Sequence, residues 1–283
     1  MSAKLLRIKN YVSVFIKRLI DDGIIALSSQ LAYSLIFAFF PFLIFLMTLV
    51  GFSSIKSSDV LEAMRKVVPY QVYGLVKNIV KEVVDTKNGK LLSVSLITSI
   101  WSCVSGFNAV IRGLNNSYKD NERRSFLKVQ LISIIFTFGL IITIFFAMLL
   151  IVFGDINEEL IIKKFGINEF FGYGVWDLIK YGILTIGMIF SFAALYRYTP
   201  ANKHKWKMVF PGAVISALGW VISSICFTYY VNNFGNYSKV YGSIGAVIVL
   251  MTWLFIISFI IICGGEINAV YFEIKNPNKL TKS

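Results

Sequence analysis

The charged residues of the chain separate long apolar runs from short polar segments. Six uncharged intervals stand out, and these are residues 23–55, 91–111, 129–154, 181–196, 208–238 and 240–265. A helix rises about 1.5 Å per residue, so about 20 apolar residues cross a hydrocarbon core of about 30 Å. Five runs are long enough, and the short run 181–196 is flanked by Lys180 and Arg197, whose side chains can reach the two surfaces. The pattern predicts six transmembrane helices, at about 24–52, 91–111, 129–153, 178–198, 208–231 and 243–270.

The N-terminal residues 1–22 contain an amphipathic helical pattern over 4–20. Its apolar face consists of Leu5, Ile8, Val12, Phe15, Ile16 and Leu19, and its basic residues are Lys4, Arg7, Lys17 and Arg18. Such a helix either lies in the interface of an anionic leaflet or packs on the bundle as a cytoplasmic helix. The charges in this segment do not fit a cleavable signal peptide.

The longest polar connection, residues 53–90, has apolar residues at helical spacing on both sides of Pro69. We expect two short amphipathic helices that form a cap outside the membrane. Their apolar faces need a partner, which is the bundle, the bilayer surface or another subunit. The predicted fold is therefore an all-α polytopic membrane protein, with an N-terminal helix (1–22), a membrane domain (23–272) and a cytoplasmic tail (273–283).

Composition and charge agree with a membrane protein. Hydrophobic residues make up 57% of the 283 residues and the mean hydropathy is +0.71, which is more apolar surface than a soluble chain of this size can bury. The net charge of +13 fits basic loops that fix topology and contact anionic lipid better than it fits nucleic acid binding. With both termini inside, the inner segments hold 17 of the 28 Lys and Arg residues. The positive-inside rule therefore predicts cytoplasmic termini.

The sequence offers little catalytic or metal-binding chemistry. Cys103, Cys226 and Cys263 all lie in apolar runs, and His204 is the only histidine, so no zinc-binding spacing exists. The 15 acidic residues are scattered, whereas metal-assisted RNA hydrolysis needs clustered carboxylates or histidines. No nucleotide-binding loop of the GxxxxGK[ST] kind is present. We expect no enzyme activity, no cofactor and no metal.

Several polar and charged residues, which are unfavourable in the hydrocarbon core, lie near the inner ends of the predicted spans. Asn108, Arg112 and Asn115 follow i, i+4, i+7 spacing and share one helical face. Arg197 ends the fourth span and Glu266 ends the sixth, both on the inner side. A carboxylate at membrane depth requires a partner, so we expect Glu266 to pair with Arg112 or Arg197. The pair is either a structural clasp or a gate on a substrate path, and Gly264 and Gly265 would let another helix approach closely.

Three further features are candidates for binding. Gln30 and Ser34 lie one turn apart in the first span and predict a polar stripe that faces protein. Gly242 and Gly245 open the sixth span, where free N–H groups of a helix N-terminus could bind an anion, although a tight turn that packs closely is the simpler explanation. The inner loop between spans two and three carries basic residues for topology anchoring or for lipid headgroups, namely Lys119, Arg123, Arg124 and Lys128.

Four segments in the same order resemble the YihY/virulence factor BrkB family of bacterial inner-membrane proteins. The resemblance covers roughly residues 25 to 270 and rests on "SSQLAYSLIFAFFPFLIFL", "WSCVSGFNAVIRGLNNSYKDNERRSF", "LYRYTPANKHKWKMVFPGAVISALGW" and "YSKVYGSIGAVIVLMTWLFIISFIIICGGEINA". It implies a six-helix protein of the bacterial cytoplasmic membrane, and it carries both suggested transport of lipid-like molecules and an old label as a tRNA-processing ribonuclease. The family pattern falls on Gln30, Pro41, Trp101, Asn108, Asn115, Arg124, Arg197, Pro200, Pro211, Tyr241, Gly242, Gly245 and Glu266.

These observations favour a transporter or flippase/scramblase for an amphipathic, anionic envelope molecule. The alternative is a membrane scaffold that docks partners on the 53–90 cap, and a ribonuclease fits least. Membrane lipids are the expected partners, and a second copy of the chain is the other candidate. A continuous polar cavity lined by Asn108, Arg112 and Glu266 would favour transport over the scaffold.

Overall fold

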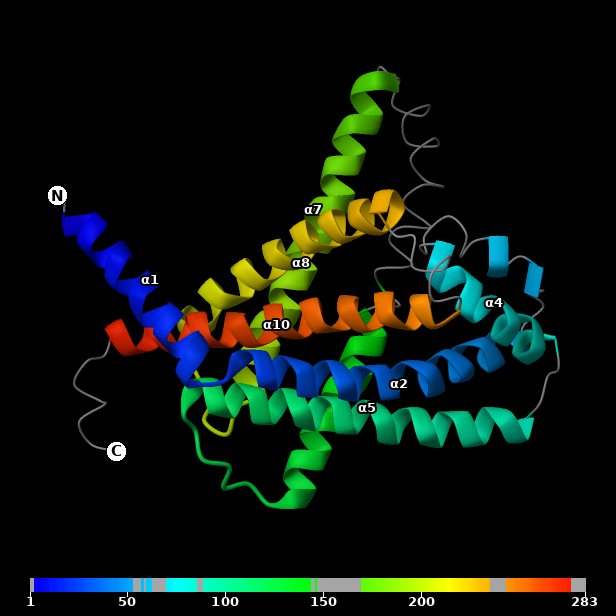
Figure 1. Ribbon diagram of the computed structural model, residues 1–283, viewed down its shortest axis with the longest axis horizontal. Coiled ribbons are helices and arrows are strands. Elements are labelled where there is room, and N and C mark those ends of the chain that lie inside the picture. The colour runs from blue at the N-terminus through cyan, green and yellow to red at the C-terminus, as the bar shows by residue number, and fades with distance from the viewer. Residues whose placement is uncertain are drawn as a thin grey trace.

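The computed structural model describes residues 3–52, 57–58, 60–62, 70–85, 89–143, 146, 169–234 and 243–275, and all regular structure in them is helical. Figure 1 shows that these helices differ in length and in direction. Their bounds are α1 (Ala3–Asp21), α2 (Ile24–Gly51), α4 (Tyr70–Val84), α5 (Gly89–Tyr118), the Phe126–Thr143 helix, α7 (Glu169–Tyr198), α8 (Trp206–Phe234) and α10 (Ser243–Lys275).

Six of the helices are long and apolar enough to cross a membrane, which confirms the predicted number of spans. They are α2, α5, the Phe126–Thr143 helix, α7, α8 and α10. The short apolar run before Arg197 belongs to a helix that is much longer than the run, because α7 starts at Glu169. Its apolar part, Leu178–Tyr198, is long enough to cross the bilayer.

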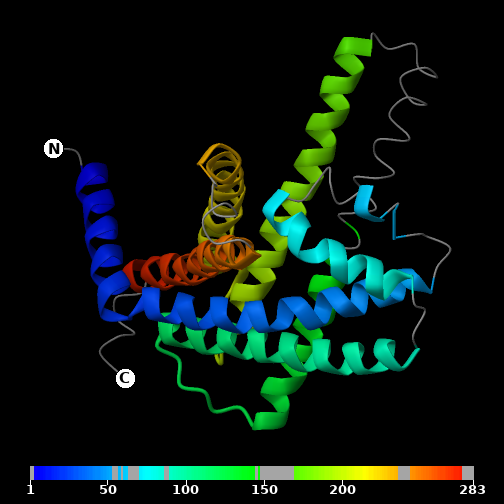
Figure 2. The ribbon, with the colours of Figure 1, turned by 45° about the vertical axis from the view of Figure 1, so that its right-hand side comes forward.

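The spanning helices form a packed group and a more open group. Helices α2, α5 and α10 run side by side, and α8 packs against α10 (Figure 2). Helix α7 packs on α8 and extends away from the other helices. The spans of α7 and of the Phe126–Thr143 helix are only 11% buried, so most of their apolar surface faces outward.

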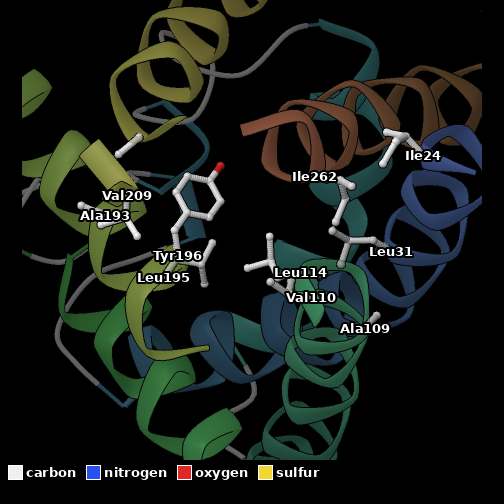
Figure 3. Packing of buried hydrophobic residues seen from close by; sticks show 11 residues of the cluster. Ile24, Leu31, Ala109, Val110, Leu114, Ala193, Leu195, Tyr196, Val209 and Ile262 are labelled. Atoms are coloured by element: carbon white, nitrogen blue, oxygen red, sulfur yellow. The ribbon is translucent and has the colours of Figure 1, made fainter. Parts of the chain in front are cut away.

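The core lies where α2, α5, α7, α8 and α10 converge, near the end of the bundle that carries α1 and the C-terminal end of α10 (Figure 3). Leu114 of α5 and Ile262 of α10 are completely buried there, as is Tyr196 of α7. Glycines allow this close packing: a Cβ on Gly264 of α10 would overlap Tyr196 and Ser216, and one on Gly265 would lie 2.5 Å from Leu114. The expected close helix approach at these two glycines is therefore confirmed.

A tight turn at Gly23 redirects the chain between α1 and α2. Gly23 has a φ of 61°, a left-handed conformation that costs glycine little. Its N–H donates to the carbonyl of Ile20, and its own carbonyl accepts the N–H of Leu27, so one residue ends α1 and starts α2. The turn lets α1 leave the direction of α2 and pack on α10 (Figure 2).

The other end of the bundle carries the helical cap. Helix α4 buries Val80 and Val84 against Leu43 of α2 and Leu61. Gly51 of α2 lies directly against the backbone of Val84, where a Cβ would be 2.6 Å from the Val84 carbonyl oxygen. In this part of the cap the apolar face is covered by the bundle itself, while the predicted break at Pro69 lies outside the described residues.

Candidate functional site

Glu266 is fully buried in α10, and its partner is Arg18 of the N-terminal helix. The Arg18 Nη1 atom lies 3.2 Å from Glu266 Oε2 and donates a second bond of 3.1 Å to the carbonyl of Ser117 in α5. The Nη2 atom donates to Glu273 Oε2 at 2.8 Å. One guanidinium thus joins α1, α5 and α10, and we call Arg18, Glu266 and Glu273 the Arg18 clasp.

The predicted pairing of Glu266 with Arg112 or Arg197 is wrong. Arg197 closes the corner between α7 and α8, where Nη1 donates to the His204 carbonyl at 2.8 Å and the guanidinium lies 4.9 Å from the Trp206 ring. Arg112 is exposed on α5. Arg112 and Ser117 are five residues apart on α5, and each residue turns the helix by about 100°. Arg112 therefore lies on nearly the opposite face of α5 from Ser117, whose carbonyl accepts a hydrogen bond from Arg18.

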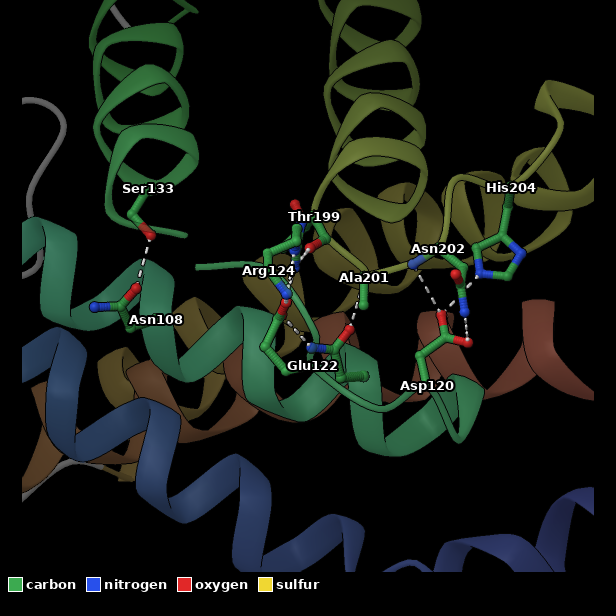
Figure 4. Close-up of polar contacts among 10 residues, drawn as sticks. Asn108, Asp120, Glu122, Arg124, Ser133, Thr199, Ala201, Asn202 and His204 are labelled. Carbon is green, nitrogen blue, oxygen red and sulfur yellow. Dashed lines mark hydrogen bonds and ion pairs between the residues drawn. The ribbon is translucent and has the colours of Figure 1, made fainter. Parts of the chain in front are cut away.

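Asn115 near the end of α5 hydrogen-bonds to two different loops. Figure 4 shows the polar network around it, with Glu122, Arg124, Thr199 and Ala201. Its Nδ2 donates to Glu122 Oε2 at 2.9 Å, and its Oδ1 accepts the N–H of Ala201 at 2.7 Å. Arg124 binds Glu122 through Nε at 2.8 Å and donates to the Thr199 carbonyl at 2.9 Å. The network ties the loop after α5 to the loop between α7 and α8.

Asp120 extends this network to the only histidine. Asn202 Nδ2 donates to Asp120 Oδ1 at 2.7 Å, and His204 Nε2 lies 3.5 Å from Asp120 Oδ2. The His204 ring stacks on Tyr118 with centroids 4.2 Å apart. Burial raises the pKa of Asp120, but the hydrogen bonds from His204 and Asn202 outweigh it, so the pKa lies below its ordinary value. The sequence pattern did not reveal this His–Asp pair, because the two residues lie in different loops.

The Glu122–Arg124 pair makes the stability of this end of the bundle depend on pH. Hydrogen bonds from Arg124 lower the pKa of Glu122 from 4.5 to about 2, and burial opposes this shift only in part. A lowered pKa stabilises the fold above pH 4.5, and this contribution fades as the pH falls towards 2. Because Glu122 is partly exposed, we expect Glu122→Gln to cost only about 1 kcal/mol at pH 7. Melting temperatures in detergent at pH 7 and pH 3 should show a smaller gap between variant and wild type at pH 3; an unchanged gap would contradict the assignment.

Asn108 connects α5 with the next spanning helix. Its Nδ2 donates to Gln130 Oε1 at 3.4 Å, and its Oδ1 accepts from Ser133 Oγ at 2.8 Å. Both partners belong to the Phe126–Thr143 helix, and Figure 4 shows the contact between Asn108 and Ser133. Asn108 lies ten residues, about 15 Å, before the end of α5, where an unpaired amide would be costly in lipid. The contact therefore marks a polar seam between these two spans.

The outward face of α5 continues this polarity along the helix. Three exposed polar side chains are spaced seven residues apart on α5, namely Thr98, Ser105 and Arg112. Two helical turns separate consecutive members, so they follow one side of α5. Trp101, 80% exposed, lies on the same face. We call Thr98, Ser105 and Arg112 the α5 polar track.

The remaining predicted residues have different surroundings. Gln30 is exposed on α2, so the expectation that it faces protein is wrong for the single chain. Gly245 lies in the first turn of α10, while Gly242 lies outside the described residues. Arg124 is not available to lipid headgroups, since its 11% exposed side chain binds Glu122. The other basic residues of this loop are exposed, and their lipid contacts remain a prediction: Lys119, Arg123 and Lys128.

Within the described part of the chain, no group of three His, Cys, Asp or Glu side chains is arranged to hold a metal ion. Cys103, Cys226 and Cys263 are free thiols.

Comparisons with known proteins place this architecture in a family. The family described as Virulence factor BrkB matches residues 15–282. A Bacillus subtilis (strain 168) protein named "Putative ribonuclease-like protein YfkH" is 40% identical, over 88% of this chain and 90% of its own length. A UPF0761 membrane protein of Tolumonas auensis is 30% identical over 36% of this chain and 32% of its own length. One of Alteromonas mediterranea is 20% identical over 92% and 87%, respectively. No solved structure matches the chain.

The profile match covers nearly the whole chain, and six helices able to cross a membrane agree with relatives that are named membrane proteins. The chain therefore belongs to the virulence factor BrkB family of membrane proteins.

Proposed function

We propose that this protein moves an amphipathic, anionic, lipid-like molecule between the leaflets of the bacterial cytoplasmic membrane, as a flippase or scramblase. The observation that carries the proposal is the α5 polar track, a line of exposed polar side chains on a membrane-spanning helix. A polar headgroup pays a large desolvation cost when it crosses hydrocarbon. Polar side chains at intervals along the route lower that cost, while the acyl chains stay in the lipid.

The spacing of the track suits such a route. Seven residues of helix span about 10 Å, so Thr98, Ser105 and Arg112 cover about 21 Å of a core of about 30 Å. Asn108 lies beside the track and bonds to Gln130 of the neighbouring helix, and both side chains are partly exposed, while Ser133 is buried behind them. The Phe126–Thr143 helix is mostly unburied, and its contact with α5 is open to the bilayer at the partly exposed Asn108 and Gln130.

The proposed route differs from the interior path that the sequence predicted. Glu266 contacts Arg18 on the far side of α5, so it does not line a common cavity with Asn108 and Arg112. Its burial and its bond to Arg18 support the structural clasp and not the gate. Since the chain contains no nucleotide-binding loop, we propose movement down a gradient without ATP hydrolysis.

The scaffold alternative is less well supported. It needs the 53–90 cap as a docking surface, but α4 already uses Val80 and Val84 to pack on the bundle. A ribonuclease role would need an acid–base pair open to RNA. The side chains of the His204–Asp120 pair are only 12% and 11% exposed. We propose that both termini are cytoplasmic, because the basic loops lie at the end that carries α1.

Reconstitution into vesicles with fluorescent phosphatidylglycerol tests the proposal, with dithionite bleaching the label that reaches the outer leaflet. With wild-type protein, dithionite should also bleach the label that started in the inner leaflet, because the protein moves it to the outer leaflet. Ser105→Leu should slow this about tenfold, because a hydroxyl on the route is replaced by an apolar side chain. The control is Ser191→Leu, which replaces an exposed serine on the spanning helix α7, away from the α5 polar track. Wild-type vesicles that behave like protein-free vesicles would refute transport of this lipid.

A further inference from the structure

Arg112 is the charged member of the α5 polar track and has no partner in the described part of the chain. Three other arginines at this end of the bundle are engaged: Arg18 by Glu266, Arg124 by Glu122 and Arg197 by the His204 carbonyl. Neither α5 nor the Phe126–Thr143 helix contains an acidic residue. A guanidinium offers five donors in a planar fork, so an exposed one within a span calls for an external anion.

We infer that Arg112 binds the phosphate group of a lipid headgroup and favours anionic headgroups, in which no choline ammonium offsets the charge of the phosphate. The role of this contact in selecting a transported lipid rests on the proposed function, whereas the binding itself does not. Guanidinium and phosphate match in geometry, because two N–H groups can donate to two phosphate oxygens. Asn108, one turn away on the same face, places an amide next to the same position.

The depth of Arg112 agrees with a lipid phosphate. Helix α5 has 30 residues and is therefore about 45 Å long, close to the full thickness of a bilayer with its headgroups. Arg112 lies six residues, about 9 Å, from the end of α5 at Tyr118. This is the border between headgroups and hydrocarbon, which an arginine side chain can span to reach phosphate. A phosphate dissolved in water has the same chemistry but reaches this depth less easily.

Electron paramagnetic resonance with spin-labelled lipids tests the site without any transport measurement. Wild-type protein in phosphatidylcholine vesicles should restrict spin-labelled phosphatidylglycerol more than spin-labelled phosphatidylcholine. Arg112→Gln should reduce this selectivity about fivefold, the loss expected for one basic residue near a membrane surface. Arg112→Lys should retain part of it. Lys207→Gln removes one exposed charge from the first turn of α8 and should change nothing.

The outcomes separate the site from the proposed function. Unchanged selectivity in Arg112→Gln overturns the site, even if the wild type moves lipid between leaflets. Lost selectivity in Arg112→Gln supports the site, even if the wild type fails to move lipid, and then only the proposed function fails. Inorganic phosphate should lower the selectivity more than sodium chloride of equal ionic strength, because it competes for the same guanidinium. Equal loss with both salts overturns the phosphate contact, and a wild type without selectivity for phosphatidylglycerol overturns the lipid assignment.

Discussion

Replacing Arg18 by glutamine is expected to lower the free energy of unfolding by about 3–5 kcal/mol, the range for a buried charge that loses its partner. Glu266 is fully buried and takes its only ion pair in the described structure from Arg18. The substitution also removes the bonds from Arg18 to Glu273 and to the Ser117 carbonyl. Thermal unfolding in detergent measures the loss. Lys17→Gln, an exposed neighbour on α1, should stay within about 0.5 kcal/mol of wild type.

A double-mutant cycle identifies the source of the loss. In Arg18→Gln with Glu266→Gln no unpaired charge remains at position 266, so the double variant should be more stable than Arg18→Gln alone. Equal stability of these two variants would show that the buried carboxylate is not the cause. A cost for Arg18→Gln as small as that for Lys17→Gln would show that α1 does not clasp the bundle.

The sequence was sufficient to locate Glu266 and its need for a partner, but not to find Arg18. The physical cost of a carboxylate in a span is a local property, so it can be read from position alone. The partner is 248 residues away and reaches Glu266 because the chain reverses at Gly23 and α1 packs on α10. Helical spacing fixes which residues share a face, and it does not say which helix that face meets.

The same distinction explains the results for the other polar residues. The shared face of Asn108 and Arg112 followed from their spacing, and the structure adds Gln130 and Ser133 as the neighbours of Asn108. Asn115 turned out to connect loops, since its partners Glu122 and Ala201 belong to segments without a periodic pattern. The six spans were predictable because length and apolarity decide them without knowledge of any neighbour.

Gly264→Ala is expected to destabilise the seam between α8 and α10 by about 2–3 kcal/mol, because the added methyl group overpacks a closed interface. The new Cβ would overlap Ser216 Oγ and the Tyr196 hydroxyl, which are joined by a buried hydrogen bond of 2.7 Å. It would therefore also break this bond, which is worth about 1 kcal/mol. The better helix propensity of alanine, about 1 kcal/mol, offsets only part of the cost.

Gly187→Ala in α7 is the matched control, because nothing lies within 4 Å of the Cβ position there. The control should leave the protein unchanged or stabilise it by up to about 1 kcal/mol through helix propensity. Gly212→Ala probes the same seam from α8, since its Cβ would meet the Gly264 carbonyl oxygen of α10. Backbone cannot rotate out of the way as a side chain can, so Gly212→Ala should cost at least as much as Gly264→Ala. If Gly264→Ala and Gly212→Ala both unfold at the wild-type temperature, α8 and α10 are not packed through these glycines in the membrane protein.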